Sequence, residues 1–223
     1  MITVHNLENS QSVRILWLLE ELGVEYKIQQ YSRNEITSFA PEEYRKLHPV
    51  GWAPTITDGH MAIAETNAIV DYILDKYPDN TLRPESGAED RLQYLYWFHA
   101  AQGSLMPHLV LTLVMRRMVS NVPFIIRPIL KYVTNLAMTT FVNPRTYKIL
   151  DYMDSELCQN QWLSGSNFSA ADIVMGYCLE SIEERFPESE NYSNIKRYIR
   201  DFRSREAYKV ALMKNGKFQS LTS

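Results

Sequence analysis

Residues 48–73 read HPVGWAPTITDGHMAIAETNAIVDYI, and this stretch decides the fold. The runs APTIT and MAIAE flank the turn signal DGH, so they predict a β-hairpin. The following run, TNAIVDYILDKYP, has apolar residues at helical spacing and predicts a helix that ends before Pro78. Pro54 precedes the first strand of this hairpin, and Glu65 and Thr66 follow the second. A backbone constraint and a carboxylate–hydroxyl pair therefore lie on either side of a short hairpin.

The chain before this stretch alternates strand and helix patterns. ITVHNL, residues 2–7, predicts a strand, and SVRILWLLEELG, residues 12–23, predicts a helix that ends at Gly23. VEYKIQQY, residues 24–31, predicts a second strand, and APEEYRKL, residues 40–47, a short helix. The order β-α-β-α-β-β-α over residues 1–80 indicates a small α/β domain.

Beyond residue 80 the pattern changes to helices. Residues 81–87 belong to a polar stretch rich in Pro, Asp and Gly, which predicts a linker. From residue 88 to 223 we expect an all-α C-terminal domain without a convincing strand. Its first helical pattern is long and has a possible kink at Pro107. The helical patterns cover residues 88–119, 124–141, 144–159 and 193–212.

One further helix start has a specific signature. Ser169 and Asp172 form a Ser-x-x-Asp capping box, and Phe168 and Ile173 stand at the positions of a hydrophobic staple. The pattern predicts the start of a buried helix, and we interpret it as structural and not catalytic.

Composition and charge exclude several classes of protein. The 223 residues are 45% hydrophobic and 22% charged, with a net charge of −3. This charge favours neither a nucleic-acid partner nor a general anionic-membrane partner, but it does not exclude a local basic patch. Cys158 and Cys178 are far apart and fit no disulfide framework or metal site. The first residues lack the pattern of a secretory signal, and residues 105–115 form an apolar run too short to cross a membrane. We expect a soluble, cytoplasmic protein.

Four motifs in this order resemble the glutathione transferase superfamily. They are NSQSVRILWLLEELGVEY at 9–26, HPVGWAPTI at 48–56, AETNAIVDYI at 64–73 and SGSNFSAADIVMG at 164–176. The long helices and FHAAQGSLMPHL are most similar to the microbial and fungal branch with an extended helical C-terminal domain. The resemblance implies a thioredoxin-like, glutathione-binding domain followed by the all-α domain. It further implies glutathione as co-substrate, no metal and a homodimer.

The resemblance also implies which residues hold the glutathione peptide. Ala53-Pro54 would be a cis peptide that lets Ala53 pair with the tripeptide as a strand would. Thr66 would cap a helix and bind the γ-glutamyl carboxylate, while Glu65 would pair with the ammonium group. Trp52 stands where many members have a basic residue. The glycyl carboxylate would rely on Trp52, on His48 or on another residue.

The thiol must also be activated. Family members place a Tyr, Ser or Cys just after the first strand, where a hydrogen bond to sulfur favours the thiolate. Ser10 lies four residues before Arg14, as in the serine-type classes, and is the first candidate. Ser12 and the Asn9 amide are rivals, and Ser10 could simply cap the first helix. We interpret Arg14 as structural.

The electrophile pocket is expected between the two domains. The candidates for its lining are Leu7, Tyr96, His99, Met106, His108 and Met115. The leading hypothesis is detoxifying conjugation of the glutathione thiolate to hydrophobic electrophiles. The alternatives are a glutathione-dependent peroxidase or disulfide reductase, and a non-catalytic glutathione-binding regulatory module.

Overall fold

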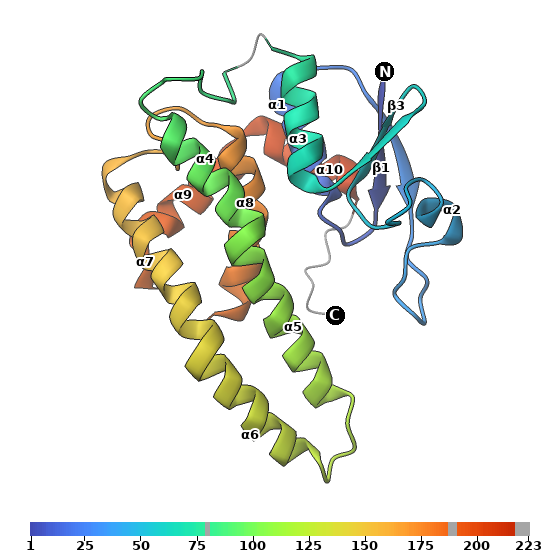
Figure 1. The fold of residues 1–223 in the computed structure, drawn as a ribbon, viewed down its shortest axis with the longest axis vertical. Helices are drawn as coiled ribbons and strands as arrows, with labels where there is room; N and C mark the ends of the chain where they lie inside the picture. The colour runs from blue at the N-terminus through green and yellow to red at the C-terminus, as the bar shows by residue number, and fades with distance from the viewer. Residues whose placement is uncertain (79–80, 187–190, 217–223) are drawn as a thin grey trace.

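The computed structural model describes residues 1–78, 81–186 and 191–216. Figure 1 shows a mixed α/β half at the N-terminus and a helical half that follows it, with one long helical hairpin extending away from both. This is the thioredoxin-like domain followed by a helical domain that the sequence predicts. No helix in the described part of the chain is long and apolar enough to cross a membrane.

The N-terminal half is built on a four-stranded sheet. The strands are β1 Ile2–Leu7, β2 Lys27–Tyr31, β3 Thr55–Asp58 and β4 Met61–Ala64, in the order β2-β1-β3-β4. β1 and β2 are parallel, and the other two pairs are antiparallel. The hairpin of the opening stretch is thus β3–β4.

Three helices accompany the sheet. They are α1 Ser12–Leu22, α2 Glu42–Arg45 and α3 Thr66–Lys76. α1 and α3 cover one face, and α2 lies on the other side (Figure 1). α1 ends where expected, because Gly23 adopts the left-handed conformation that closes a helix. β2 and α2 are shorter than their sequence patterns predict.

The C-terminal half consists of helices. They are α4 Arg91–Ala100, α5 Met106–Ser120, α6 Arg127–Ala137, α7 Asn143–Gln159, α8 Ala170–Arg185, α9 Ser193–Ser204 and α10 Glu206–Asn215. π-helical turns join α4 to α5 at Ala101–Leu105 and α6 to α7 at Met138–Val142. The expected kink near Pro107 takes the form of the first of these turns. Proline lacks an N–H, so the carbonyl one turn earlier loses its helical partner.

The capping box at the start of α8 is confirmed. Asp172 is fully buried and accepts hydrogen bonds from the backbone N–H groups of Ser169 and Leu163, at 2.8 and 3.0 Å, and from the Tyr198 hydroxyl at 2.9 Å. The Ser169 hydroxyl donates to the same carboxylate at 2.9 Å. This network joins α8 to α9 and has the structural role predicted for it.

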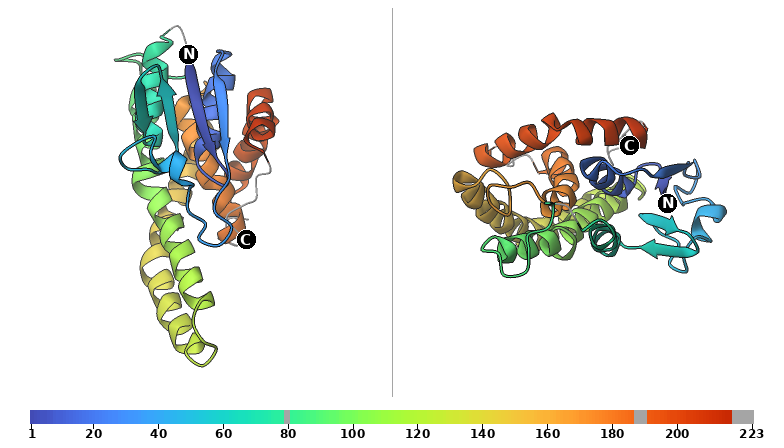
Figure 2. Two further views of the ribbon diagram at one scale, coloured as in Figure 1. Left: turned by 90° about the vertical axis from the view of Figure 1, so that its right-hand side faces the viewer. Right: turned by 90° about the horizontal axis from the view of Figure 1, so that it is seen from above.

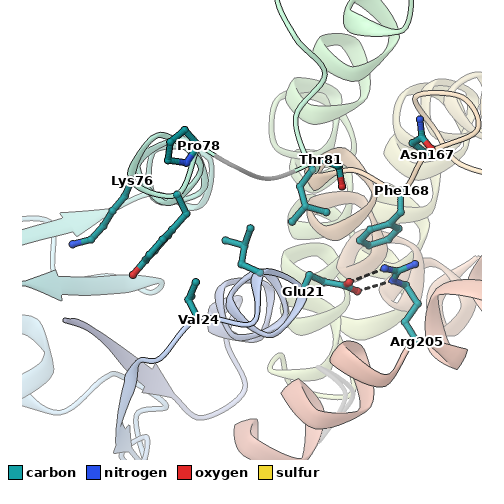
Figure 3. A pocket seen from close by; sticks show the side chains of 11 residues that line it. Glu21, Val24, Lys76, Pro78, Thr81, Asn167, Phe168 and Arg205 are labelled. Atoms are coloured by element: carbon teal, nitrogen blue, oxygen red, sulfur yellow. Dashed lines mark hydrogen bonds and ion pairs between the residues drawn. The ribbon is translucent and has the colours of Figure 1, made fainter.

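α1 connects the two halves of the molecule. One side of it packs on the sheet and α3, and the other packs on α8 and α10 (Figure 2). Near its C-terminal end, Glu21 accepts two hydrogen bonds of 2.6 Å from Arg205 and one of 2.8 Å from the Trp17 indole. Figure 3 shows this ion pair beside a cavity of about 670 Å³. The cavity lies at the opposite end of α1 from the residues expected to bind glutathione.

Candidate functional site

The loop between β1 and α1 is held in place by an arginine from the segment after β2. Arg33 donates hydrogen bonds to the carbonyl oxygens of Glu8 at 2.8 Å and Asn9 at 3.3 Å. Asn9 has a positive φ of 51°, which turns the chain from the strand into the helix. Its side-chain nitrogen donates to no other residue in the described part of the chain.

Ser10 and Ser12 are both buried and form one hydrogen-bonded pair. The Ser10 hydroxyl donates to the Ser12 hydroxyl at 2.9 Å and accepts the Ser12 N–H at 3.2 Å. The Ser12 hydroxyl in turn contacts the carbonyl oxygen of His5 at 3.5 Å. Ser10 therefore lies just before the N-terminus of α1, and the Ser12 side chain lies beneath it and faces the interior.

Gln11 stands at the centre of a network that the sequence reasoning missed. Its side-chain oxygen accepts hydrogen bonds from Arg14 at 2.9 Å, Gln102 at 3.1 Å and the Thr66 hydroxyl at 3.2 Å. These donors come from α1, the turn before α5, and α3. Gln11 thus ties the N-termini of α1 and α3 to the helical half. No local pattern marks it, because its partners lie up to 91 residues away.

Arg14 is buried between the two halves of the molecule. It donates to the side-chain oxygen of Gln102 at 3.0 Å and to the Cys178 sulfur at 3.2 Å, and its guanidinium lies 4.6 Å from the centre of the Tyr177 ring. Burial raises the pKa of the Cys178 thiol, so this sulfur is neutral. Arg14 forms no ion pair with any carboxylate among the described residues.

The segment before β3 presents free backbone groups. The Ala53–Pro54 bond is cis, and neither the N–H nor the C=O of Ala53 is hydrogen-bonded within the described residues. Trp52 is 73% exposed, and its carbonyl oxygen accepts the Thr55 hydroxyl at 2.9 Å. His48 uses one ring nitrogen to accept the Val50 N–H at 3.3 Å.

The pair after β4 divides into one exposed and one buried side chain. Glu65 has a positive φ of 75°, which is rare for a residue with a side chain. Its carboxylate is exposed and has no partner in the described ranges. Thr66 is 1% exposed and begins α3, whose first N–H groups form a site that suits an anion.

The structure does not bring the six expected electrophile-pocket residues together. Leu7 is buried at the end of β1, and Met106 packs against the core. Tyr96 is half-exposed and packs edge-on against Tyr152 of α7, whereas His99 is exposed beside Phe98.

His108 and Met115 lie on the side of α5 that faces α6 and α7. His108 contacts the Thr146 hydroxyl of α7 at 3.2 Å, and Met115 lines a separate cavity of about 460 Å³ between α5, α6 and α7. Burial lowers the pKa of His108. The physical reason is phase: the π-helical turn before α5 adds residues to one turn and rotates every later side chain relative to α4.

The other side of α5 carries a different apolar row. Val110, Val114 and Met118 recur every four residues, and each is about half-exposed. In Figure 1, α6 and α7 lie on one side of α5 and the N-terminal half lies on the other. By helical spacing, Val110 and Val114 lie on roughly the opposite side of α5 from His108 and Met115.

Two family models match the chain. The model of the glutathione S-transferase N-terminal domain matches residues 1–75, and that of the C-terminal domain matches residues 113–206. Glutathione S-transferase 3 of Schizosaccharomyces pombe is 33% identical over 96% of this chain and 88% of its own length. Glutathione S-transferase 1 of Saccharomyces cerevisiae is 28% identical over 93% of this chain and 92% of its own length.

Solved structures of glutathione S-transferases have the same fold as this chain. A glutathione S-transferase from Actinobacillus pleuropneumoniae superposes with a TM-score of 0.80 at 30% identity, covering 100% of this chain and 96% of that one. A theta-class enzyme from Xanthomonas axonopodis pv. citri, solved with glutathione bound, has a TM-score of 0.74 at 26% identity, covering 99% of both chains.

Proposed function

The chain belongs to the glutathione S-transferase family, and we propose that it conjugates the glutathione thiolate to hydrophobic electrophiles. The observation that carries this proposal is that three sets of groups lie at the same end of the strands β1, β3 and β4. These are the free backbone groups of Ala53, the unpaired carboxylate of Glu65, and the N-termini of α1 and α3, joined by the Gln11–Thr66 hydrogen bond.

The peptide part of glutathione would be held by groups that lack a partner now. Ala53 offers one donor and one acceptor to the cysteinyl residue, as an added strand would use them. Glu65 offers a carboxylate to the γ-glutamyl ammonium group, a charge-assisted pairing. Trp52 and His48 are the proposed neighbours of the glycyl carboxylate, with hydrogen bonds in place of a cation.

The γ-glutamyl carboxylate would bind at the start of α3. The N–H groups of its first turn attract an anion, and Thr66 adds a hydroxyl. That hydroxyl now donates to Gln11, whose side-chain nitrogen has no partner in the described residues. We therefore add Gln11 to the proposed binding residues, because its amide can donate to the carboxylate while its oxygen keeps the network together.

The thiolate would be stabilised by Ser10 at the start of α1. Its hydroxyl accepts the Ser12 N–H, which anchors it, and its proton must turn from the Ser12 oxygen to the sulfur. The helix N-terminus and the buried, unpaired charge of Arg14 favour the same anion. Asn9 remains the alternative donor, since its side-chain nitrogen is not used otherwise.

The electrophile would lie against the row Val110, Val114 and Met118. In the reaction, a sulfur electron pair forms the new carbon–sulfur bond, and the leaving group departs with its own electron pair. An apolar wall of β-branched and Met side chains positions such substrates without specific hydrogen bonds.

The proposal is tested by retention on glutathione-agarose together with a conjugation assay using an aryl halide. Retention with turnover supports it, and failure to bind glutathione contradicts it. Retention without turnover would favour the binding module, which the lack of a basic side chain at position 52 keeps open. Turnover of a hydroperoxide alone would favour the peroxidase.

A further inference from the structure

The outer end of the α5–α6 hairpin has an apolar surface, on α6 and on the connection between the two helices, that the proposed transfer reaction does not use. Figures 1 and 2 show that α5 and α6 extend together well beyond the rest of the molecule. We call residues 116–136 the hairpin end: they comprise the last turn of α5, the connection, and nearly all of α6.

One side of the hairpin end is apolar and exposed. On α6, the side chains of Ile129, Tyr132, Val133 and Leu136 recur at the i, i+3, i+4, i+7 spacing of a single helix face. Each is between 51% and 72% exposed. Such a face is normally buried, so a contiguous exposed one marks an interaction surface.

The connection extends this apolar face to the tip of the hairpin. Phe124 and Ile125 are 77% and 72% exposed, more than most large apolar side chains of this chain. Two large side chains at the outermost point of a projecting hairpin meet any flat surface before the rest of the molecule does.

All charged residues in and around the hairpin end are basic. Residues 91–150 contain no Asp or Glu and seven Lys or Arg, although the whole chain has a net charge of −3. Four of the seven lie at the hairpin end: Arg116, Arg117, Arg127 and Lys131. Three of the four, Arg116, Arg127 and Lys131, line the cavity between α5, α6 and α7.

We propose that the hairpin end docks on an anionic lipid surface, with α6 lying in the interface. Its apolar face and tip would enter the boundary between headgroups and acyl chains, as an interfacial amphipathic helix does. Arg127 and Lys131 line the cavity on the other side of α6, and Arg127 donates to the carbonyl oxygens of Ser120 and Val122. Both cations would therefore attract anionic headgroups through the positive potential of the hairpin end. The overall composition hides this local basic patch.

The hairpin end of a second copy of the chain fits this surface less well. Two hairpin ends placed face to face would bring four cations against four, with no carboxylate between them. Like charges across an interface disfavour association. An anionic bilayer matches both the apolar row and the sign of the charge.

The test is co-sedimentation of the full chain with vesicles of phosphatidylcholine, with and without phosphatidylglycerol. We expect binding that requires phosphatidylglycerol and weakens as salt is raised. Ile125→Gln combined with Ile129→Gln should reduce the bound-to-free ratio about tenfold or more. The matched control is Ile36→Gln with Leu92→Gln, two residues away from the hairpin that are more exposed than Ile125 and Ile129, and this variant should bind like the native chain.

A second pair of variants tests the charge. Arg127→Gln with Lys131→Gln should weaken binding about tenfold at low salt, and Lys27→Gln with Lys46→Gln should not. Native protein that stays in solution with both vesicle types would overturn the proposal. Equal binding to phosphatidylcholine alone, or hairpin variants that lose only self-association in light scattering, would overturn it too.

Discussion

Two helix N-termini of this chain use similar side chains for different purposes. At the start of α8, Asp172 is fully buried, and four donors satisfy its carboxylate. At the start of α3, the Glu65 carboxylate is exposed and no described residue pairs with it. A polar group whose hydrogen bonds are all satisfied within the protein is structural, whereas one with unsatisfied hydrogen bonds can bind a ligand.

The largest effect is expected when the buried carboxylate of Asp172 is removed. Asp172→Ala should lower the free energy of unfolding by about 3–5 kcal/mol, because buried N–H and O–H donors lose their acceptor. Urea denaturation measures the effect. Ser166→Ala, at an exposed position nearby, should change stability by less than about 0.5 kcal/mol. A mild effect of Asp172→Ala would mean that the network is not structural.

Removing the unsaturated pair should affect binding more than stability. Glu65→Ala with Thr66→Ala should weaken glutathione binding by about 2–4 kcal/mol, since two charge-assisted contacts are lost. Isothermal titration measures this, with Glu25→Ala, an exposed acid beyond the far end of α1, as control. A change of a few tenths of a kcal/mol would show that glutathione binds elsewhere.

Gln11 combines the properties of Asp172 and Glu65, because one of its side-chain atoms is fully hydrogen-bonded and the other is not. Its side-chain oxygen accepts three hydrogen bonds, while its side-chain nitrogen has no partner among the residues that the structure describes. Gln11→Ala should therefore reduce both the free energy of unfolding and glutathione affinity, each by about 1–2 kcal/mol. Gln102→Ala, which disturbs the same network from the helical half, should reduce stability alone. Equal losses of affinity in both variants would remove Gln11 from the binding site.

The smallest effect is expected at Ser10. Ser10→Ala should raise the pKa of bound glutathione by at most about one unit, since a neutral hydrogen bond contributes about 0.5–1.5 kcal/mol and one unit corresponds to ~1.4. Below that pKa, less of the thiol is ionised, so turnover near neutral pH should fall about tenfold and recover at alkaline pH. Thiolate absorbance of the complex against pH measures the shift.

Ser12→Ala is the control for Ser10, because Ser12 lies beneath it and faces the interior. It should leave the thiol pKa unchanged, although it can lower stability. A shift with Ser12→Ala but not with Ser10→Ala would move the assignment to Ser12. If neither variant shifts the pKa, the Asn9 amide or backbone N–H groups activate the thiol.

Local patterns in the sequence determined the fold. Alternation predicted the strands, helical periodicity predicted α1, α3 and most later helices, and the Ser169–Asp172 spacing predicted the start of α8. These signals depend on neighbours within a few residues, so they need no tertiary information. The boundaries at residues 80 and 88 stay a prediction. The cis bond at Pro54 required the family resemblance, since a proline alone does not determine its isomer.

Only the tertiary structure decided the rest of the site. It brought Gln11, Thr66 and Gln102 together, although they lie far apart in sequence. It also decided which side of α5 faces α6 and α7, because one π-helical turn shifts the phase that periodicity assumes. The predicted His108 and Met115 consequently face α6 and α7. The spacing of apolar residues predicts that a helix has an apolar and a polar face, but only tertiary packing determines which element each face contacts.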